Sequence, residues 1–115
     1  MGTARGKAAK EIIDSGSDEK FTPAICVAEV YAKSLKSEGA EMAEMRRNFI
    51  RDRSAVAPLT EEIAVAAAKI DVERKKVVHR WGLADSTVLA TGRELSARVV
   101  TGDEHFRGLS DVMVI

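Results

Sequence analysis

The sequence has almost no cysteine and no long hydrophobic run, and both absences exclude classes of protein. Cys26 is the only cysteine among 115 residues, so the chain has neither a disulfide framework nor a cysteine-based zinc site. No apolar run approaches the roughly 20 residues that a membrane-spanning helix needs. The amino-terminal stretch MGTARGKAAKEII lacks the apolar core of a secretory signal. We therefore expect a protein of the reducing cytoplasm.

The chain also has no net charge, since 18 Lys and Arg residues balance 18 Asp and Glu residues. A nucleic-acid-binding domain is often basic overall, so the composition alone does not indicate one. Positive charge is nevertheless clustered in two groups, which are Arg46, Arg47, Arg51 and Arg53, and Arg74, Lys75, Lys76, His79 and Arg80. Each group is typical of a solvated helix face. The alternative is contact with phosphates beside an acidic site.

Three common catalytic signatures are missing: a Ser-His-Asp spacing, a glycine-rich phosphate loop and a zinc motif. Helical periodicity is expected at residues 7–14, 25–37, 41–53, 61–79 and 83–96, with Thr60 as a helix N-cap and a helical turn at 104–109. Short strands are expected at 21–24, 55–59, 97–101 and 112–115. Apolar strands that alternate with helices indicate one α/β domain, residues 1–115, with a parallel sheet.

Asp85 lies in the first turn of the helix expected at residues 83–96. On a helical wheel it shares an apolar arc with Val88, Leu89 and Gly92, whereas the other side carries Ser86, Thr87, Arg93 and Glu94. A carboxylate in an apolar arc must be capped, paired or bound to a metal, because an unpaired buried charge is very costly. Aspartate is also a common helix N-cap, so capping is the alternative to metal binding.

Asp103 follows the short strand expected at residues 97–101. Ligands of a parallel sheet gather beyond the carboxyl ends of its strands, and Gly102 lets the backbone turn sharply beside the acid. Gly-Asp is equally a common turn pair. His105, two residues further on, is either a metal or phosphate contact or an ordinary loop residue.

Glu29 lies in the helix expected at residues 25–37, which is apolar nearly all round. It falls on the narrow polar edge with Lys33 and Lys36, and that position indicates a solvated residue. Because the helix follows a strand-like segment, the carboxyl-end argument also places Glu29 near the other two acids. Carboxylates gathered at such ends form a hard-cation site, and hard-cation sites carry out phosphodiester chemistry.

Three segments, taken in order, carry a family resemblance. They are FTPAICVAEVY at residues 21–31, Leu59-Thr60 with the long helix after it, and LADS at 83–86 followed by VTGD at 100–103 and Phe106. Together they resemble the PIN-domain nucleases of the VapC type, the toxin ribonucleases of toxin–antitoxin pairs. The resemblance covers nearly the whole chain and is most specific in its last part.

The resemblance implies a three-layer α/β domain with a mainly parallel central sheet flanked by helices. It also implies a ribonuclease site that holds Mg²⁺ or Mn²⁺, with Glu29, Asp85 and Asp103 as both catalytic carboxylates and metal ligands. The secondary site residues are Thr101, Ser86 and His105. The implied substrate is RNA, and the implied partners are a small antitoxin and a second copy of the chain, in the cytoplasm.

The chain departs from the family pattern in two places. The family begins with a strand that ends in an aspartate, whereas this chain opens at what resembles the family's first helix, residues 6–13. The position two past Asp103, often acidic in the family, is His105. The missing strand lies in the middle of the family's sheet, so we expect its two neighbours to lose a ladder partner. We expect a truncated chain or a misplaced start; a closed gap and a strand from a partner are the alternatives.

Hypotheses of different functional classes follow from these observations. Asp85 in an apolar arc favours a metal-dependent endoribonuclease. The missing first acid favours a catalytically weakened PIN-like module that acts in binding or assembly. A third hypothesis is an α/β domain in which the acids are only helix caps and turn residues.

Overall fold

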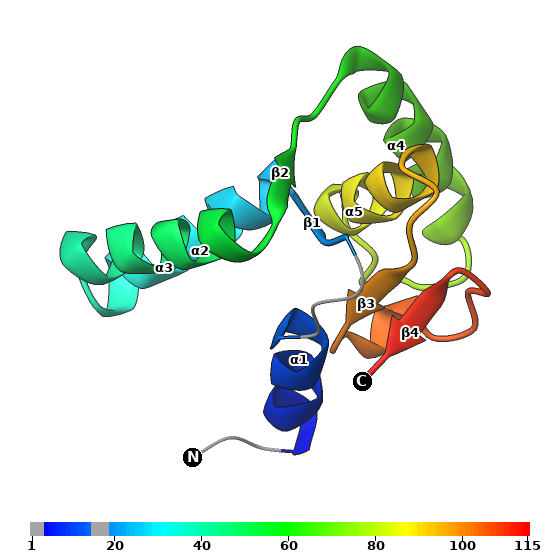
Figure 1. Cartoon of the computed structure of the whole chain (residues 1–115). Helices are drawn as coiled ribbons and strands as arrows, with labels where there is room; N and C mark the ends of the chain where they lie inside the picture. Colours follow the sequence, from blue (N-terminus) through cyan, green and yellow to red (C-terminus); the bar gives the residue numbers. More distant parts are fainter. Residues whose placement is uncertain (1–3, 15–18) are drawn as a thin grey trace.

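The computed structural model describes residues 4–14 and 19–115 and shows helices alternating with short strands (Figure 1). The α-helices are α1 (Ala4–Asp14), α2 (Ala24–Ser37), α3 (Ala40–Arg53), α4 (Glu61–Arg74) and α5 (Leu83–Glu94). The strands are β1 (Phe21–Pro23), β2 (Ala55–Ala57), β3 (Val99–Thr101) and β4 (Val112–Val114), with a 3-10 turn η1 (Glu104–Phe106) between the last two. Among the described residues, no helix combines the length and apolar character that crossing a membrane requires.

The strands form two separate parallel pairs. β1 pairs with β2, with Phe21 opposite Ala55, and β3 pairs with β4, with Val99 opposite Val112. The expected α/β class and the parallel pairing are therefore confirmed. In the part of the chain that the structure describes, the two pairs do not join into one sheet.

α5 lies at the centre of the arrangement, since it packs along α4 and also contacts both β1 and β3. Ile63 and Ala67 of α4 meet Ala90 of α5 in one apolar cluster. A second cluster joins α5 to the carboxy-terminal strands through Trp81, Leu89, Val99 and Phe106. Trp81 lies both in the core and at the junction between α4 and α5.

The buried arc of α5 is wider than its apolar residues alone predict. Ser86 and Thr87, expected on the solvated side, are both buried, and so is Thr91. Thr87 Oγ1 donates to the carbonyl oxygen of Leu83 at 2.9 Å, and Thr91 Oγ1 donates to that of Thr87 at 2.7 Å. These bonds to the preceding turn satisfy the hydroxyls, so the threonines enter the interior without an unpaired polar group.

α4 ends at Arg74, five residues before the end expected from the spacing of Ile63, Ile70 and Val77. The chain leaves the helix in a turn at 75–77, and the side chain of Val77 is 74% exposed. The expected extension of this helix to residue 79 is therefore wrong. Leaving the helix early lets Val78 pack against the core and brings Trp81 into its centre, a burial that stabilises more than another exposed helical turn would.

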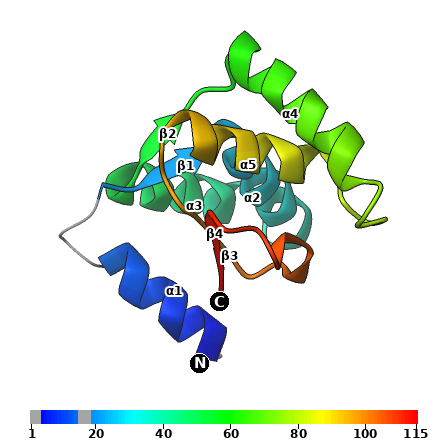
Figure 2. The ribbon, with the colours of Figure 1, turned by 90° about the vertical axis from the view of Figure 1, so that its right-hand side faces the viewer.

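α2 and α3 form a helical hairpin that extends away from α4 and α5, and α1 stands apart from both helix pairs (Figures 1 and 2). Polar contacts hold the hairpin together as well as packing. Tyr31 donates its hydroxyl to Glu44, and the guanidinium of Arg46 donates to Glu38 and to the buried Ser34, at 3.0 Å in the latter case. Within the described residues, the main connections between the hairpin and the rest of the molecule are the short β1–β2 ladder, which meets α5 through β1, and contacts of α2 with α5.

The close approach of α5 to β3 requires a glycine at position 92. A Cβ atom there would lie 2.7 Å from Cγ2 of Val99 and 3.3 Å from the carbonyl oxygen of Ala97. We predict that Gly92→Ala lowers the free energy of unfolding by about 1–3 kcal/mol through overpacking, despite the better helix propensity of alanine. Urea denaturation of the variant measures this cost.

Val99→Ala removes the obstructing methyl groups and provides the control. In a double-mutant cycle, Gly92→Ala should cost less in the Val99→Ala background than in the parent. An equal cost in both backgrounds would show that contact with Val99 is not the reason for the glycine.

Candidate active site

Asp85 caps the helix that carries it. Its Oδ2 accepts the backbone N–H of Gly82 at 2.9 Å, and the side chain is half-buried in the first turn of α5. The carboxylate thus satisfies one backbone donor at the start of the helix and places negative charge at the positive end of the helix dipole. Asp85 therefore caps the helix from its third position, whereas the N-cap residue that the alternative expected at Asp85 is Gly82.

Asp103 is held in the same way, in the turn that follows β3. Its Oδ1 accepts the backbone N–H of His105 at 2.8 Å, and His105 Nδ1 lies 3.0 Å from the same oxygen. Thr101 Oγ1 accepts the backbone N–H of Asp103 at 3.1 Å. Asp103 therefore caps η1, as the turn interpretation predicts, and Thr101 orients the backbone of the acid. The side chain of Asp103 remains 39% exposed, so solvent can reach the carboxylate.

Glu29 is exposed on α2, as its place on the polar edge predicts. It lies near Cys26, whose thiol is free and half-buried. Burial raises the pKa of Cys26 to about 11, and the negative charge of Glu29 adds to this rise. The thiol is therefore protonated at neutral pH and is a poor nucleophile and metal ligand. The thiol of Cys26 therefore does not take the place of a carboxylate ligand beside Glu29.

The three acids do not form a metal centre within residues 4–14 and 19–115. No group of three or more His, Cys, Asp or Glu side chains in that part of the chain lies close enough to hold a metal ion. The residues that the structure describes therefore do not fit a divalent cation as a complete ligand set. Asp85 and Asp103 are instead each placed at the start of a helical element, with one oxygen bonded to a backbone amide.

Ser86 belongs to a buried chain of hydrogen bonds beside Asp85. Trp81 Nε1 donates to Ser86 Oγ at 2.6 Å, and Ser86 Oγ donates to Asp71 Oδ1 at 3.1 Å. The other oxygen of Asp71 pairs with Lys75 at 2.9 Å. Ser86 has no exposed surface, so in this structure it ties α4 to α5 and does not face solvent. The sequence indicated Ser86 as a site residue but gave no partner for it.

Arg74 is the residue whose role the sequence interpretation missed. It was grouped with the solvated cations, yet it is half-buried and its Nη2 donates to the carbonyl oxygens of His105 at 2.7 Å and Arg107 at 3.2 Å. Its position carried a usable signal, because Arg74 follows Ala67 and Ile70 on the buried face of α4 at helical spacing. The prediction that Arg74 lies on a solvated helix face is therefore wrong.

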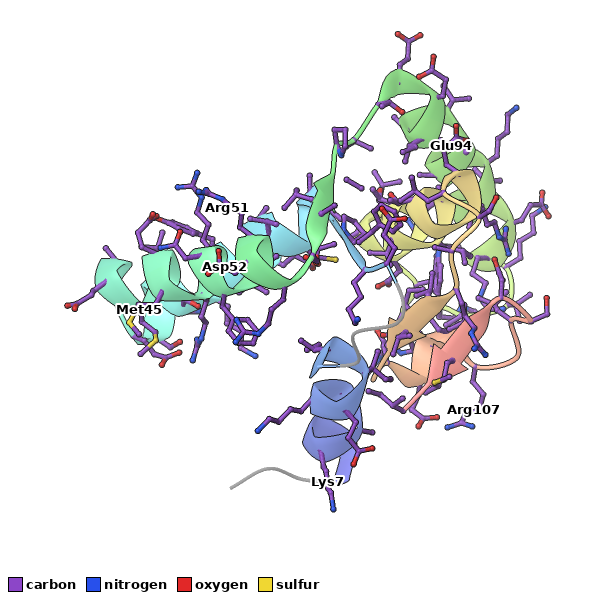
Figure 3. All side chains as sticks on the ribbon, in the orientation of Figure 1. Lys7, Met45, Arg51, Asp52, Glu94 and Arg107 are labelled. Carbon is purple, nitrogen blue, oxygen red and sulfur yellow. The ribbon has the colours of Figure 1, made fainter. Side chains whose placement is uncertain are left out.

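The other group of cations does lie on an exposed surface of α3, where Arg51 points outward (Figure 3). Arg47 pairs with Glu44 at 3.2 Å, and the guanidinium of Arg53 lies 3.9 Å from the ring centroid of Phe49. Contacts of this kind, within one exposed helix, are typical of a solvated face. The structure thus favours the solvated interpretation for Arg47, Arg51 and Arg53, whereas Arg46 bonds to Glu38 and to the buried Ser34 of α2.

Comparison with known proteins gives one family and one fold. The family profile of the PIN domain matches residues 2–112. A toxin–antitoxin complex from Klebsiella pneumoniae has a TM-score of 0.74, covering 98% of this chain and 85% of that chain at 19% sequence identity. VapBC2 from Rickettsia felis, bound to a DNA fragment from their promoter, has a TM-score of 0.72, covering 95% and 81% at 13% identity. No curated protein matches the sequence significantly.

The cap formed by Asp85 makes a prediction about stability. Asp85→Ala leaves the Gly82 amide without its acceptor and should lower the free energy of unfolding by about 0.5–2 kcal/mol, whereas Asp85→Asn keeps an oxygen acceptor and should lose less. Urea denaturation compares the two variants, with Asp52→Ala as a control at an exposed site near the end of α3. An Asp85→Asn protein more stable than the parent would contradict a simple cap and indicate repulsion from neighbouring carboxylates.

Proposed function

Because this chain belongs to the PIN-domain family, whose profile matches nearly its whole length, residues 2–112, we propose that it is a nuclease. PIN domains are generally nucleases, and this membership is the observation that carries the proposal. The substrate we propose is single-stranded RNA, cleaved at a phosphodiester. The cofactor we propose is Mg²⁺ or Mn²⁺, because carboxylate oxygens are the ligands that these cations prefer.

Glu29, Asp85 and Asp103 are the acids that we assign to the proposed activity. The last two support it by their placement, since Asp85 lies in the first turn of α5 and Asp103 lies between β3 and η1. Thr101 orients the backbone of Asp103, Ser86 anchors the start of α5, and His105 pairs with Asp103. Because the described residues do not group these acids around an ion, we propose that activity depends on completing the site with a further acid.

We also propose that the chain is the toxin of a toxin–antitoxin pair, that it acts in the cytoplasm and that it forms a homodimer. The two structures that share its fold support the first part, since one is described as a toxin–antitoxin complex and the other as VapBC2. The partner in this proposal is a small antitoxin protein.

The alternative function is a PIN-like module that binds or assembles without cleaving. Two observations favour it: no metal-binding group of three side chains within the described residues, and the structural roles of Asp85 and Asp103 as caps. The nuclease and the module differ in whether a divalent cation binds and whether RNA is cut, and two measurements separate them.

Cleavage of a fluorescent single-stranded RNA tests the nuclease directly. With the site completed by a further acid, we predict cleavage in Mg²⁺ or Mn²⁺ that EDTA abolishes and that Asp103→Asn lowers by about 100-fold or more, because the proposed cation loses an anionic ligand. Asp52→Asn, the same change at an exposed position of α3, should leave the rate unchanged.

A second protein, in which this chain is preceded by an added strand that ends in aspartate, tests whether the site needs completion. Cleavage only by the longer protein would support the incomplete site. Cleavage by neither protein under any of these conditions would contradict the nuclease and favour the binding module.

Binding of the cation is measurable without RNA. We predict that Mn²⁺ raises the melting temperature by several degrees when its concentration reaches about ten times its dissociation constant, since ligand binding then adds about 1.4 kcal/mol to the free energy of unfolding. Asp103→Asn should abolish the rise, and Asp52→Asn should retain it. A chain whose melting temperature does not respond to millimolar Mn²⁺ lacks the proposed site.

A further inference from the structure

One guanidinium connects α4 to the turn that carries Asp103. Nη2 of Arg74 donates to the carbonyl oxygens of His105 and Arg107, 31 and 33 residues away along the chain. These carbonyls lie at the end of η1, where backbone acceptors have no partner within the turn itself. A cation at the carboxyl end of a helical element also interacts favourably with its dipole. Asp103 therefore caps the amino end of η1, and Arg74 binds the carbonyl oxygens at its carboxyl end.

The same side chain is connected to the start of α5. The guanidinium of Arg74 lies 5.2 Å from the ring centroid of Trp81, within the range of a cation–π contact. Trp81 packs on Phe106 of η1, with ring centroids 4.7 Å apart and an angle of 58° between the planes. Trp81 also donates to Ser86, and Ser86 donates to Asp71 of α4. One buried cluster thus touches both elements that carry a candidate acid.

We propose that Arg74 is a positioning residue that fixes the turn of Asp103 and His105 relative to the start of α5, where Asp85 and Ser86 lie. Trp81 transmits this constraint, because its ring touches Arg74 and Phe106 while its N–H reaches Ser86. The consequence for catalysis rests on the proposed nuclease function, but the mechanical role does not. Without the guanidinium, the hydrogen bonds from α4 to the carbonyl oxygens of His105 and Arg107 are lost, and Asp103 can move relative to Asp85.

The chemistry of the contact requires arginine and not only a positive charge. One planar guanidinium reaches two carbonyls and at the same time lies near the indole ring, a combination that the compact ammonium of lysine does not reproduce. The Nε–H of Arg74 is buried and has no hydrogen-bond partner among the described residues. A buried donor without a partner is unfavourable, so the guanidinium is held in place by its contacts with the turn and the ring, and not by its inner nitrogen.

Hydrogen exchange of the backbone amides of His105, Phe106 and Arg107 tests the proposal on the full chain. In Arg74→Gln we expect these amides to exchange about tenfold faster or more, as loss of a charge-assisted hydrogen bond predicts. Amides in the α2–α3 hairpin should keep their rates. Arg107→Gln is the matched control, because the side chain of Arg107 points away from the molecule (Figure 3) and pairs on the surface with Glu104, at 2.7 Å.

Arg74→Lys keeps the charge and guards against a Gln variant that fails to fold. Its exchange at 105–107 should be intermediate between the parent and Arg74→Gln. Parent-like protection in Arg74→Lys would overturn the requirement for a guanidinium at position 74. Unchanged exchange at 105–107 in Arg74→Gln, an equal acceleration throughout the protein, or an equal effect of Arg107→Gln would each overturn the positioning role.

Kinetics add a readout that a purely structural role would not produce. If the parent cleaves RNA, Arg74→Gln should lower kcat while KM for RNA changes little, because misplacement of Asp103 affects the reacting geometry and not the binding surface. Arg74→Lys should restore part of kcat. Absence of ribonuclease activity in both this chain and the protein with the added strand overturns the proposed function alone, since the exchange experiment still decides the role of Arg74.

Discussion

Burial of Trp81 is the constraint on which the carboxy-terminal half of the molecule depends. The indole is only 2% exposed and lies where α4, α5 and η1 meet. A ring of this size removes a large apolar area from water, but its N–H must also find a partner when buried. Ser86 accepts that N–H, and Asp71 in turn accepts the hydroxyl of Ser86. The early end of α4, the burial of Ser86 and the place of Phe106 all follow from where this one side chain lies.

The second constraint is the division of the strands into two pairs. A two-stranded ladder of three residues per strand is marginal by itself, so each pair depends on the helices that cover it. α5 contacts both β1 and β3, and this helix therefore provides the main connection between the pairs within the described chain. The glycine at position 92 is part of the same arrangement, because it lets α5 approach β3 closely enough to bury Val99.

The sequence predicted the local elements better than the contacts between them. Thr60 was expected as an N-cap and does accept the backbone N–H of Ile63 at 3.2 Å, because a cap depends only on neighbouring residues. The end of α4 depends instead on Trp81, whose burial no periodicity within α4 records. The width of the buried arc of α5 was also underestimated. The hydroxyls of Thr87 and Thr91 donate hydrogen bonds to carbonyl oxygens of their own helix, so these polar residues can be buried.

The acids themselves show why a site is harder to predict than a fold. Asp85 and Asp103 have residue types and positions that suit both a backbone cap and a cation, and both form caps in this structure. The two roles do not compete for the same atoms, because an ionised carboxylate has two oxygens and about four acceptor positions. A cap uses one of these positions and fixes the direction of the others. The hydrogen bonds that explain these acids locally are therefore also what would hold them in a fixed orientation toward a ligand.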